Sequence, residues 1–264
     1  MVSFPSHTEI DVARLVALRR CVLAVSVIDG FDAMPGDDGV TLDAGPQLLL
    51  PWAEVDRVVG DTEPEGTQGR SRLRTWFQMR TSLLRLRDPQ RHARAIGLPR
   101  GHVLHPGPPW VRHHVHGGGL DLGVGLIGLF DDPDQVVVVP RMLFAAAGID
   151  DEPWWPLLAF SLEQTGRLAA ARHTNDPQLP LRPFGDFDVV TLLGSSAFRT
   201  ELCQADPLGW RSAAVPMRQR GWLDLGRIDP AFAAAAALAT EPHERGFERA
   251  ILVTSEEVVV IAAG

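Results

Sequence analysis

Residues 120–126 read Leu120-Asp-Leu-Gly-Val-Gly-Leu126, so that large apolar residues alternate with small or acidic ones. Successive side chains of a strand point to opposite faces, and this period of two therefore predicts a β-strand with one apolar face. The opposite face carries Gly123 and Gly125, and a glycine face is typical of a place where another backbone, an aromatic ring or a ligand approaches closely. A turn at residues 131–134 and an apolar run at 135–139 predict the strand that returns alongside it.

The segments on either side of this strand pair alternate between hairpins and helices. Hairpins are expected at residues 40–50 and 249–262, and buried strands at 21–28 and 187–193. Helices are expected at residues 8–19, 51–59, 71–87, 142–147, 154–173, 195–204 and 229–240, and the Pro- and Gly-rich residues 88–109 are expected to form a long loop. This mixture predicts an α+β (mixed α/β) fold, in which a mostly antiparallel or mixed sheet built from hairpins is covered by helices.

The chain has 264 residues, which is enough for one large domain with a substantial core. We expect a single globular domain over residues 1–264. A Glu-, Gly-, Pro- and Thr-rich stretch at residues 61–70 reads as a linker, so a small N-terminal lobe at residues 1–60 is the alternative arrangement.

The composition is that of a folded, acidic protein, with 45% hydrophobic residues and a formal net charge of -8. The acidic balance disfavours general nucleic-acid binding. No apolar run is long enough to span a bilayer, and no secretory signal begins the chain, so we expect a soluble cytoplasmic protein without a membrane partner. Cys21 and Cys203 lack CxxC spacing and are expected to be reduced and buried. The sequence contains neither lysine nor tyrosine, which is typical of a GC-rich, bacterial genome. Nothing in it indicates an oligomeric state.

Histidines are concentrated in one region, since six of the nine fall between residues 92 and 116. His114 and His116 are two positions apart and would point to the same side of a strand, as paired imidazole ligands often do. With His102, His105 and Asp121 as further ligands, they would bind a divalent transition metal. An open coordination position could then activate water, which makes a metal-dependent enzyme one candidate. The alternative is a set of surface or hydrogen-bonded loop histidines.

The spacing of His114, His116, Asp121 and Gly128 is similar to the first motif of the cupins, with Asp121 where that family usually has glutamate. The resemblance covers about 15 residues and implies a metal-binding β-barrel. A second cupin motif with the third histidine is not found in the sequence, and the expected helix content departs from a pure barrel.

A second resemblance involves His116-Gly-Gly-Gly119, which is similar to the oxyanion-hole motif of hormone-sensitive-lipase-like esterases. It implies a serine esterase with glycine amides as oxyanion donors. The nucleophile would be Ser196 in Gly194-Ser-Ser-Ala-Phe198, with His243 as base, but Phe198 stands where the nucleophile elbow has glycine. The alternative is that Ser195 or Ser196 caps the following helix.

Arginines form the third feature, because residues 70–100 hold nine arginines and one acid, Asp88. This segment carries about +8, which leaves about -16 for the rest of a chain whose net charge is -8. Arginine offers planar, bidentate donors to carboxylates and phosphates, so the asymmetry favours binding of an acidic protein or a small anionic ligand. The alternative is intramolecular neutralisation. The candidate residues are Arg72, Arg80, Arg87, Arg91 and Arg94, with Arg218 and Arg220 from a second loop rich in Arg, Gly and an aromatic residue.

No catalytic motif is complete in the sequence. The leading hypothesis is therefore a cytosolic binding or regulatory protein for an acidic partner or small anionic ligand, and the metal-dependent enzyme and the serine esterase are the alternatives.

Overall fold

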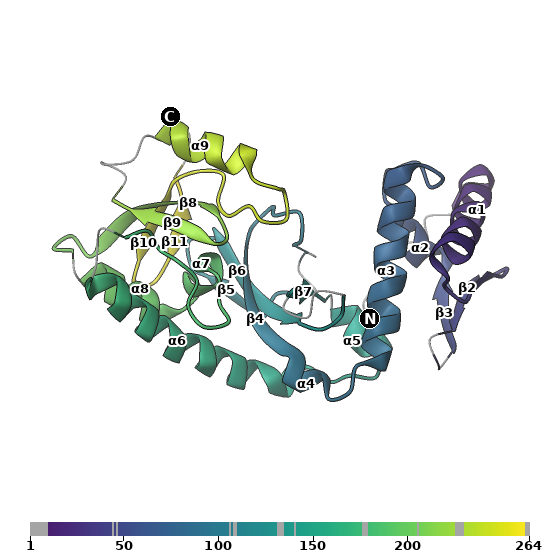
Figure 1. Ribbon diagram of the computed structural model, residues 1–264, viewed down its shortest axis with the longest axis horizontal. Helices are drawn as coiled ribbons and strands as arrows, with labels where there is room; N and C mark the ends of the chain where they lie inside the picture. Colours follow the sequence, from purple (N-terminus) through teal and green to yellow (C-terminus); the bar gives the residue numbers. More distant parts are fainter. Residues whose placement is uncertain are drawn as a thin grey trace, which may run out of the picture. The chain divides into compact units, whose positions relative to one another are not determined.

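The computed structural model describes residues 10–43, 45, 47–105, 107, 110–130, 135–139, 141–175, 179–204, 206–224 and 230–261. The chain forms two compact units (Figure 1). The N-terminal unit consists of Met1–Arg87 with Leu129–Pro133, and the C-terminal unit consists of Asp88–Gly128 with Asp134–Gly264. All pairings between the named strands of the described chain are antiparallel, and helices pack on the sheets, which confirms the predicted α+β fold.

In the N-terminal unit, helices pack against a sheet of strand order β1-β2-β3. Buried residues of every element build its core, among them Val22, Leu42, Trp52 and Phe77. The predicted hairpin at residues 40–50 is confirmed as β2 and β3. In chain order the elements are α1 (Val12–Asp29), β1 (Ala33–Pro35), β2 (Gly39–Asp43), β3 (Gln47–Pro51), α2 (Trp52–Val59) and α3 (Thr67–Arg85).

The buried strand predicted at residues 21–28 is wrong, because α1 runs through the whole segment. Its buried positions are Leu18, Cys21, Val22 and Val25; Cys21 and Val22 lie three and four residues after Leu18, and the four form one helical stripe. A short apolar run fits a buried helix and a buried strand equally well, and packing decides between them. The helix ends at Gly30, whose positive φ of 73° is a left-handed C-cap.

Part of the predicted linker is helical, since α3 begins at Thr67. The division between the two units falls after Arg87, so α3 lies entirely in the N-terminal unit. The single domain over residues 1–264 and the lobe at residues 1–60 stay predictions.

The C-terminal unit contains two larger sheets. In one, the strand order is β4-β6-β5, with β7 also paired to β6, and in the other it is β11-β10-β8-β9. The elements in chain order are α4 (Pro89–His92), β4 (Ala93–Pro99), β5 (His113–Val115), β6 (Leu120–Leu126), β7 (Val137–Val138), α5 (Arg141–Ala146), η1 (Glu152–Trp154), α6 (Trp155–Asn175), α7 (Val189–Leu192), α8 (Ser196–Gln204), β8 (Trp210–Met217), β9 (Arg220–Leu223), α9 (Pro230–Ala239), β10 (Ile251–Thr254) and β11 (Val258–Val260).

Both sheets contribute to one main core with α6, α7 and α8. Leu122 of β6, Phe198 of α8 and Val253 of β10 are among its buried residues. Figure 1 shows α6 alongside β4, with which it is in contact. Cys203 of α8 also lies in this core, and its thiol donates to the Val253 carbonyl oxygen at 3.4 Å. Both cysteines are free and buried, and burial raises the pKa of the Cys21 thiol to about 11.

Two sequence predictions for this unit are wrong. The strand expected at residues 187–193 is the short helix α7, because the Asp188 carboxylate caps it by accepting from the Thr191 amide at 2.7 Å. The loop expected at residues 88–109 contains β4, whose residues are almost all buried and pair with the whole length of β6. The hairpin of β8 and β9 was also missed, whereas the C-terminal hairpin, β10 and β11, is confirmed.

The glycine face of β6 meets an aromatic ring at Gly123, which is one of the three alternatives expected from the sequence. A Cβ atom added to Gly123 would lie 2.3 Å from Cε2 of Trp110, whose side chain is only 1% exposed. The indole nitrogen of Trp110 donates to the Val124 carbonyl oxygen at 2.9 Å. On Gly125 the added atom would lie 2.7 Å from a methyl group of Val136. Glycine is therefore required on this face by packing.

A second close approach joins the two sheets at what we call the glycine seam, residues 116–119 against β11. The His116 carbonyl oxygen accepts from the Val258 amide at 3.0 Å, and the Gly119 amide donates to the Val258 carbonyl oxygen at 3.2 Å. A Cβ atom on Gly117 or Gly119 would lie within 2.9 or 2.7 Å of that same oxygen. The triple glycine therefore lets two backbones pair directly.

Replacing Gly123 by alanine tests the contact with Trp110. We expect Gly123→Ala to lower the free energy of unfolding of the C-terminal unit by about 2 kcal/mol, because the ring has no free space to move into. Urea denaturation followed by far-UV circular dichroism measures the change. Gly36→Ala is the control, since its added Cβ would meet only the Gly39 carbonyl oxygen at 3.5 Å. A midpoint for Gly123→Ala equal to that of the wild type would contradict this account.

Candidate functional site

A pocket of about 340 Å³, which we call the polar pocket because three arginines line it, lies in the C-terminal unit. The turn that follows β4, residues 99–103, forms one wall, and Gly118 and Gly119 of the glycine seam form another. The segment between α9 and β10 closes it with Pro242 and residues 245–249, and Val260 of β11 completes the lining. Backbone pairing at the seam thus brings together three stretches that are far apart in the sequence.

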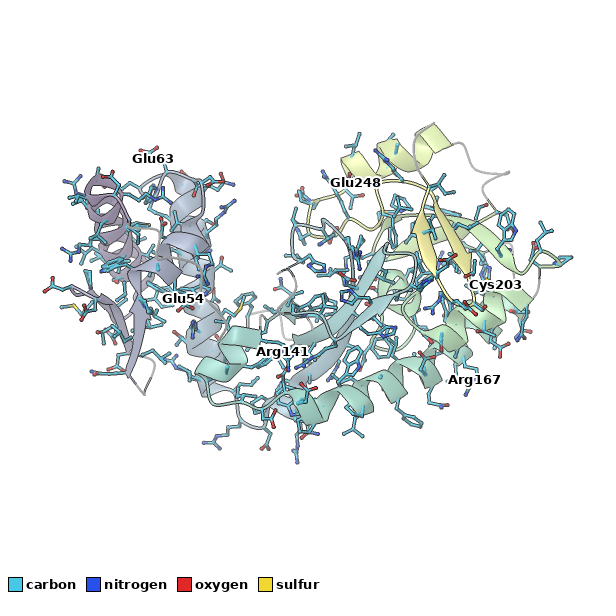
Figure 2. The ribbon with its side chains drawn as sticks, turned by 180° about the vertical axis from the view of Figure 1, so that it is seen from behind. Glu54, Glu63, Arg141, Arg167, Cys203 and Glu248 are labelled. Atoms are coloured by element: carbon cyan, nitrogen blue, oxygen red, sulfur yellow. The ribbon has the colours of Figure 1, made fainter. Side chains whose placement is uncertain are left out.

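Positive charge dominates the lining of the pocket, which includes Arg100, Arg245 and Arg249 and a single acid, Glu248. The Arg245 side chain is anchored, because its Nε donates to the Thr240 carbonyl oxygen at 3.0 Å. Arg249 is exposed and makes no hydrogen bond or ion pair with the described residues. Figure 2 labels Glu248, which lies between Phe247 and Arg249 in this segment, 3.9 Å from a guanidinium nitrogen of Arg245. The arrangement leaves uncompensated positive charge for an anion.

His102 also lines the pocket, and it is held in its neutral form. Burial, followed by the charge of Arg218, lowers the pKa of the imidazole to about 4, and the backbone of Arg245 opposes this only in part. The Nδ1 atom accepts from the Leu104 amide at 3.1 Å, which places the ring proton on Nε2. No described residue gives Nε2 a hydrogen bond of good geometry. His102 is therefore an uncharged lining residue whose buried Nε2 faces the backbone of Arg245.

Arg100 connects the pocket to a buried carboxylate. Its Nε lies 3.3 Å from both oxygens of Asp121, which also accepts from Nδ1 of His114 at 2.7 Å and from Nε2 of His105 at 3.0 Å. His105 is fixed in this orientation, because its Nδ1 accepts from the Gly107 amide at 3.0 Å. The ring of His105 also packs edge-on against Trp110. The cluster is a set of donors around one acceptor group.

These donors set the ionisation of Asp121. Burial raises the pKa of the carboxyl group, but the hydrogen bonds from His114 and His105 and the charge of Arg100 outweigh it, so the pKa lies below its usual value. The carboxylate is therefore charged at neutral pH and holds Arg100 beside the pocket.

The proposed metal ligands do not form one group. The structure brings His105, His114 and Asp121 together, whereas His102 lines the pocket and His116 pairs with Glu257 at 3.1 Å. Both nitrogens of His105 already take part in hydrogen bonds. In the described parts of the chain, no three His, Cys, Asp or Glu side chains are placed to hold a metal ion. The metal centre stays a prediction that this geometry does not favour.

The serines of the esterase hypothesis have a structural role. The hydroxyl groups of Ser195 and Ser196 donate to the Glu163 carboxylate at 2.9 and 3.1 Å, and the amides of Ser196 and Ala197 donate to it as well. Ser195 is fully buried, and its Oγ also accepts from the Phe198 amide at 3.1 Å. These contacts close the first turn of α8, as the capping alternative predicted.

Two of the three glycine amides of the same hypothesis, those of Gly118 and Gly119, are already engaged. Gly118 donates its N–H to the Val115 carbonyl oxygen at 3.3 Å, and Gly119 donates to Val258. An oxyanion hole requires amides that point at the reacting group, so these two amides do not supply one.

The arginines predicted to bind an anion are distributed over both units, with Arg72, Arg80 and Arg87 in the first and Arg91, Arg94, Arg218 and Arg220 in the second. Most of them have intramolecular partners. Arg80 is buried, pairs with Glu54, which Figure 2 labels, and lies over the Trp76 ring. Arg72 donates to the Val59 carbonyl oxygen at 3.0 Å.

In the second unit Arg94 pairs with Asp186 at 3.3 Å, and the Nε of Arg218 donates to Asp188 at 2.9 Å. Arg91 lies 3.9 Å from Asp88 and is largely exposed, as are Arg87 and Arg220. None of these seven arginines lines the polar pocket. Arg100, which belongs to the arginine-rich segment but was not among the candidates, does line it.

Sequence reasoning missed Arg245 and Arg249. A signal was available, because Arg245-Gly-Phe-Glu-Arg249 combines Arg, Gly and an aromatic residue, as do the loops at residues 182–186 and 218–222. Comparisons with protein families, with curated proteins and with solved structures find no match for this chain. Within the described residues, no helix is both long and apolar enough to cross a membrane.

Removal of the Asp121 charge should change how stability depends on pH. The pKa of this carboxyl group is lower in the folded state than in the unfolded state, where it is about 3.9. The charged group therefore stabilises the fold fully when the pH is above the unfolded-state pKa. This stabilisation is lost as the pH falls through the folded-state pKa. We expect Asp121→Asn to lower the free energy of unfolding by about 2 kcal/mol near neutral pH. The difference from the wild type should shrink as the pH is lowered from about 6 to about 3.

Urea denaturation at a series of pH values measures this difference. The control is Asp37→Asn, since the Asp37 carboxylate is fully exposed. A difference between Asp121→Asn and the wild type that stays constant over the acid range would show that the charge of Asp121 does not contribute.

Proposed function

We propose that the protein is a cytosolic binding protein whose ligand is a small anion, held in the polar pocket between the glycine seam and residues 245–249. The observation that carries the proposal is the convergence of Arg100, Arg245 and Arg249 on one pocket with a single acid in its lining. The acidic composition and the two buried, free cysteines support the cytosolic location.

A small ligand is favoured over an acidic protein by the size of the pocket and by the pairing of the other arginines. A volume of about 340 Å³ falls in the range of small-molecule sites. Arg74, Arg80 and Arg94 pair with carboxylates of the same chain, so part of the arginine-rich segment is neutralised within the molecule.

The donors in the pocket suit a carboxylate or a phosphate group. Guanidinium groups bind both anions with two parallel hydrogen bonds, and Arg249 has no competing partner in the described chain. Gly118 leaves room for Arg100, because a Cβ atom there would lie 3.2 Å from its Nη1. Glu248 can accept from a hydroxyl or amino group of the same ligand.

Calorimetric titration with inorganic phosphate and with succinate tests the proposal. We expect both probes to bind at low ionic strength and to weaken as salt is added, because the attraction is electrostatic. Arg249→Gln should weaken binding about tenfold, a loss of about 1.4 kcal/mol. Glu248→Gln should strengthen binding, since it removes the one negative charge of the lining.

The matched control is Arg220→Gln, which removes an exposed arginine of the same unit that lies outside the pocket. It should leave the affinity unchanged. The proposal fails if neither probe binds at low ionic strength, or if Arg220→Gln weakens binding as much as Arg249→Gln does.

A further inference from the structure

A second pocket of the C-terminal unit has a volume of about 210 Å³. Ala169, Arg172 and His173 of α6 form one side, and Phe198 of α8 contributes to the wall. The remaining lining comes from Leu179, Pro180, Leu181, Arg182 and Phe184. The two pockets share no lining residue.

Apolar side chains make up most of the residues that line this second pocket, and several of them belong to the main core. Leu181 and Phe198 are 3% and 2% exposed and belong to that core, and Phe184 packs against it. Ala169 is the smallest side chain that α6 contributes to the lining, beside Arg172 and His173. Apolar cavities of about 150 Å³ are large enough to bind benzene, so a single ring fits here.

Two arginines lie in the lining, and both side chains are exposed. Neither Arg172 nor Arg182 makes an ion pair or a hydrogen bond with the described residues, whereas Arg94, Arg211 and Arg218 of the same unit are paired with aspartates. Unpaired cations beside an apolar pocket complement a molecule that has an apolar body and an anionic end.

We propose that this pocket binds a small amphipathic carboxylate with a single aromatic or aliphatic ring, the ring lying among Leu181, Phe184 and Phe198 and the carboxylate at Arg172 and Arg182. Transfer of the ring out of water supplies the affinity. The guanidinium groups select an acid over a neutral compound of the same shape. This proposal does not depend on the function proposed for the polar pocket.

Binding of benzoate and of benzamide, measured by ligand-observed NMR titration on the full chain, tests the inference. We expect the wild type to bind benzoate at least five times more tightly than benzamide, because only benzoate carries the charge. The Arg172→Gln/Arg182→Gln double variant should bind benzoate about tenfold more weakly. It should bind benzamide as the wild type does. Ala169→Leu should bind neither compound, since the larger side chain fills the pocket.

Arg167→Gln is the control for charge on the same helix, because Arg167 lies on α6 (Figure 2) and does not line the pocket. Thermal unfolding by circular dichroism verifies that each variant is folded. If Ala169→Leu does not fold, the double arginine variant still tests the inference. The inference is overturned if the wild type does not bind benzoate, if benzamide binds equally well, or if the double variant retains full affinity. It is also overturned if Arg249→Gln abolishes benzoate binding, which would place benzoate in the polar pocket.

Discussion

The backbone pairing of residues 116–119 with β11 is the constraint on which the C-terminal unit depends. It joins the sheet of β4, β5 and β6 to the sheet of β8 to β11 through main-chain hydrogen bonds at Val258, and it tolerates no side chain at Gly117 or Gly119. Each sheet alone would expose the apolar face that the main core now buries. The same pairing sets Gly118 opposite residues 245–249, so the polar pocket is a by-product of how the sheets are joined.

The 25 arginines of the chain differ in whether a carboxylate lies close enough to pair with them. Arg80 and Arg218 are buried and paired, and removal of their partners would leave a charge uncompensated in the interior. Arg100 is intermediate, since Asp121 holds it in place while its guanidinium still borders a pocket. Arg172, Arg182 and Arg249 have no such partner among the described residues and therefore supply charge to the two pockets. Paired arginines and arginines that line a pocket are thus the same residue type in different surroundings.

Much of the fold could be predicted from the sequence, because local patterns carry it. The alternation in β6 and its glycine face, the hairpin of β10 and β11 and the long helix α6 were all recognisable. Residues 21–28 were not, since their apolar run suits a helix as well as a strand. The strand β4 was hidden because it contains Gly97 and Pro99, and it pairs along its length with β6. The polar pocket could not be predicted either, because it depends on contacts between distant segments. Arg100 and Arg249 line the same pocket only because the glycine seam joins the two sheets.

The packing of Trp110 on Gly123 has a consequence for how this sequence can diverge. The indole fills the space above the glycine and donates to the adjacent carbonyl of Val124, so neither position can change alone without a clash or a void. Substitutions at these two positions should therefore be inherited together. A relative with a larger residue at position 123 should have a smaller one at position 110, and that paired change would identify the same strand in chains too divergent to align by overall similarity.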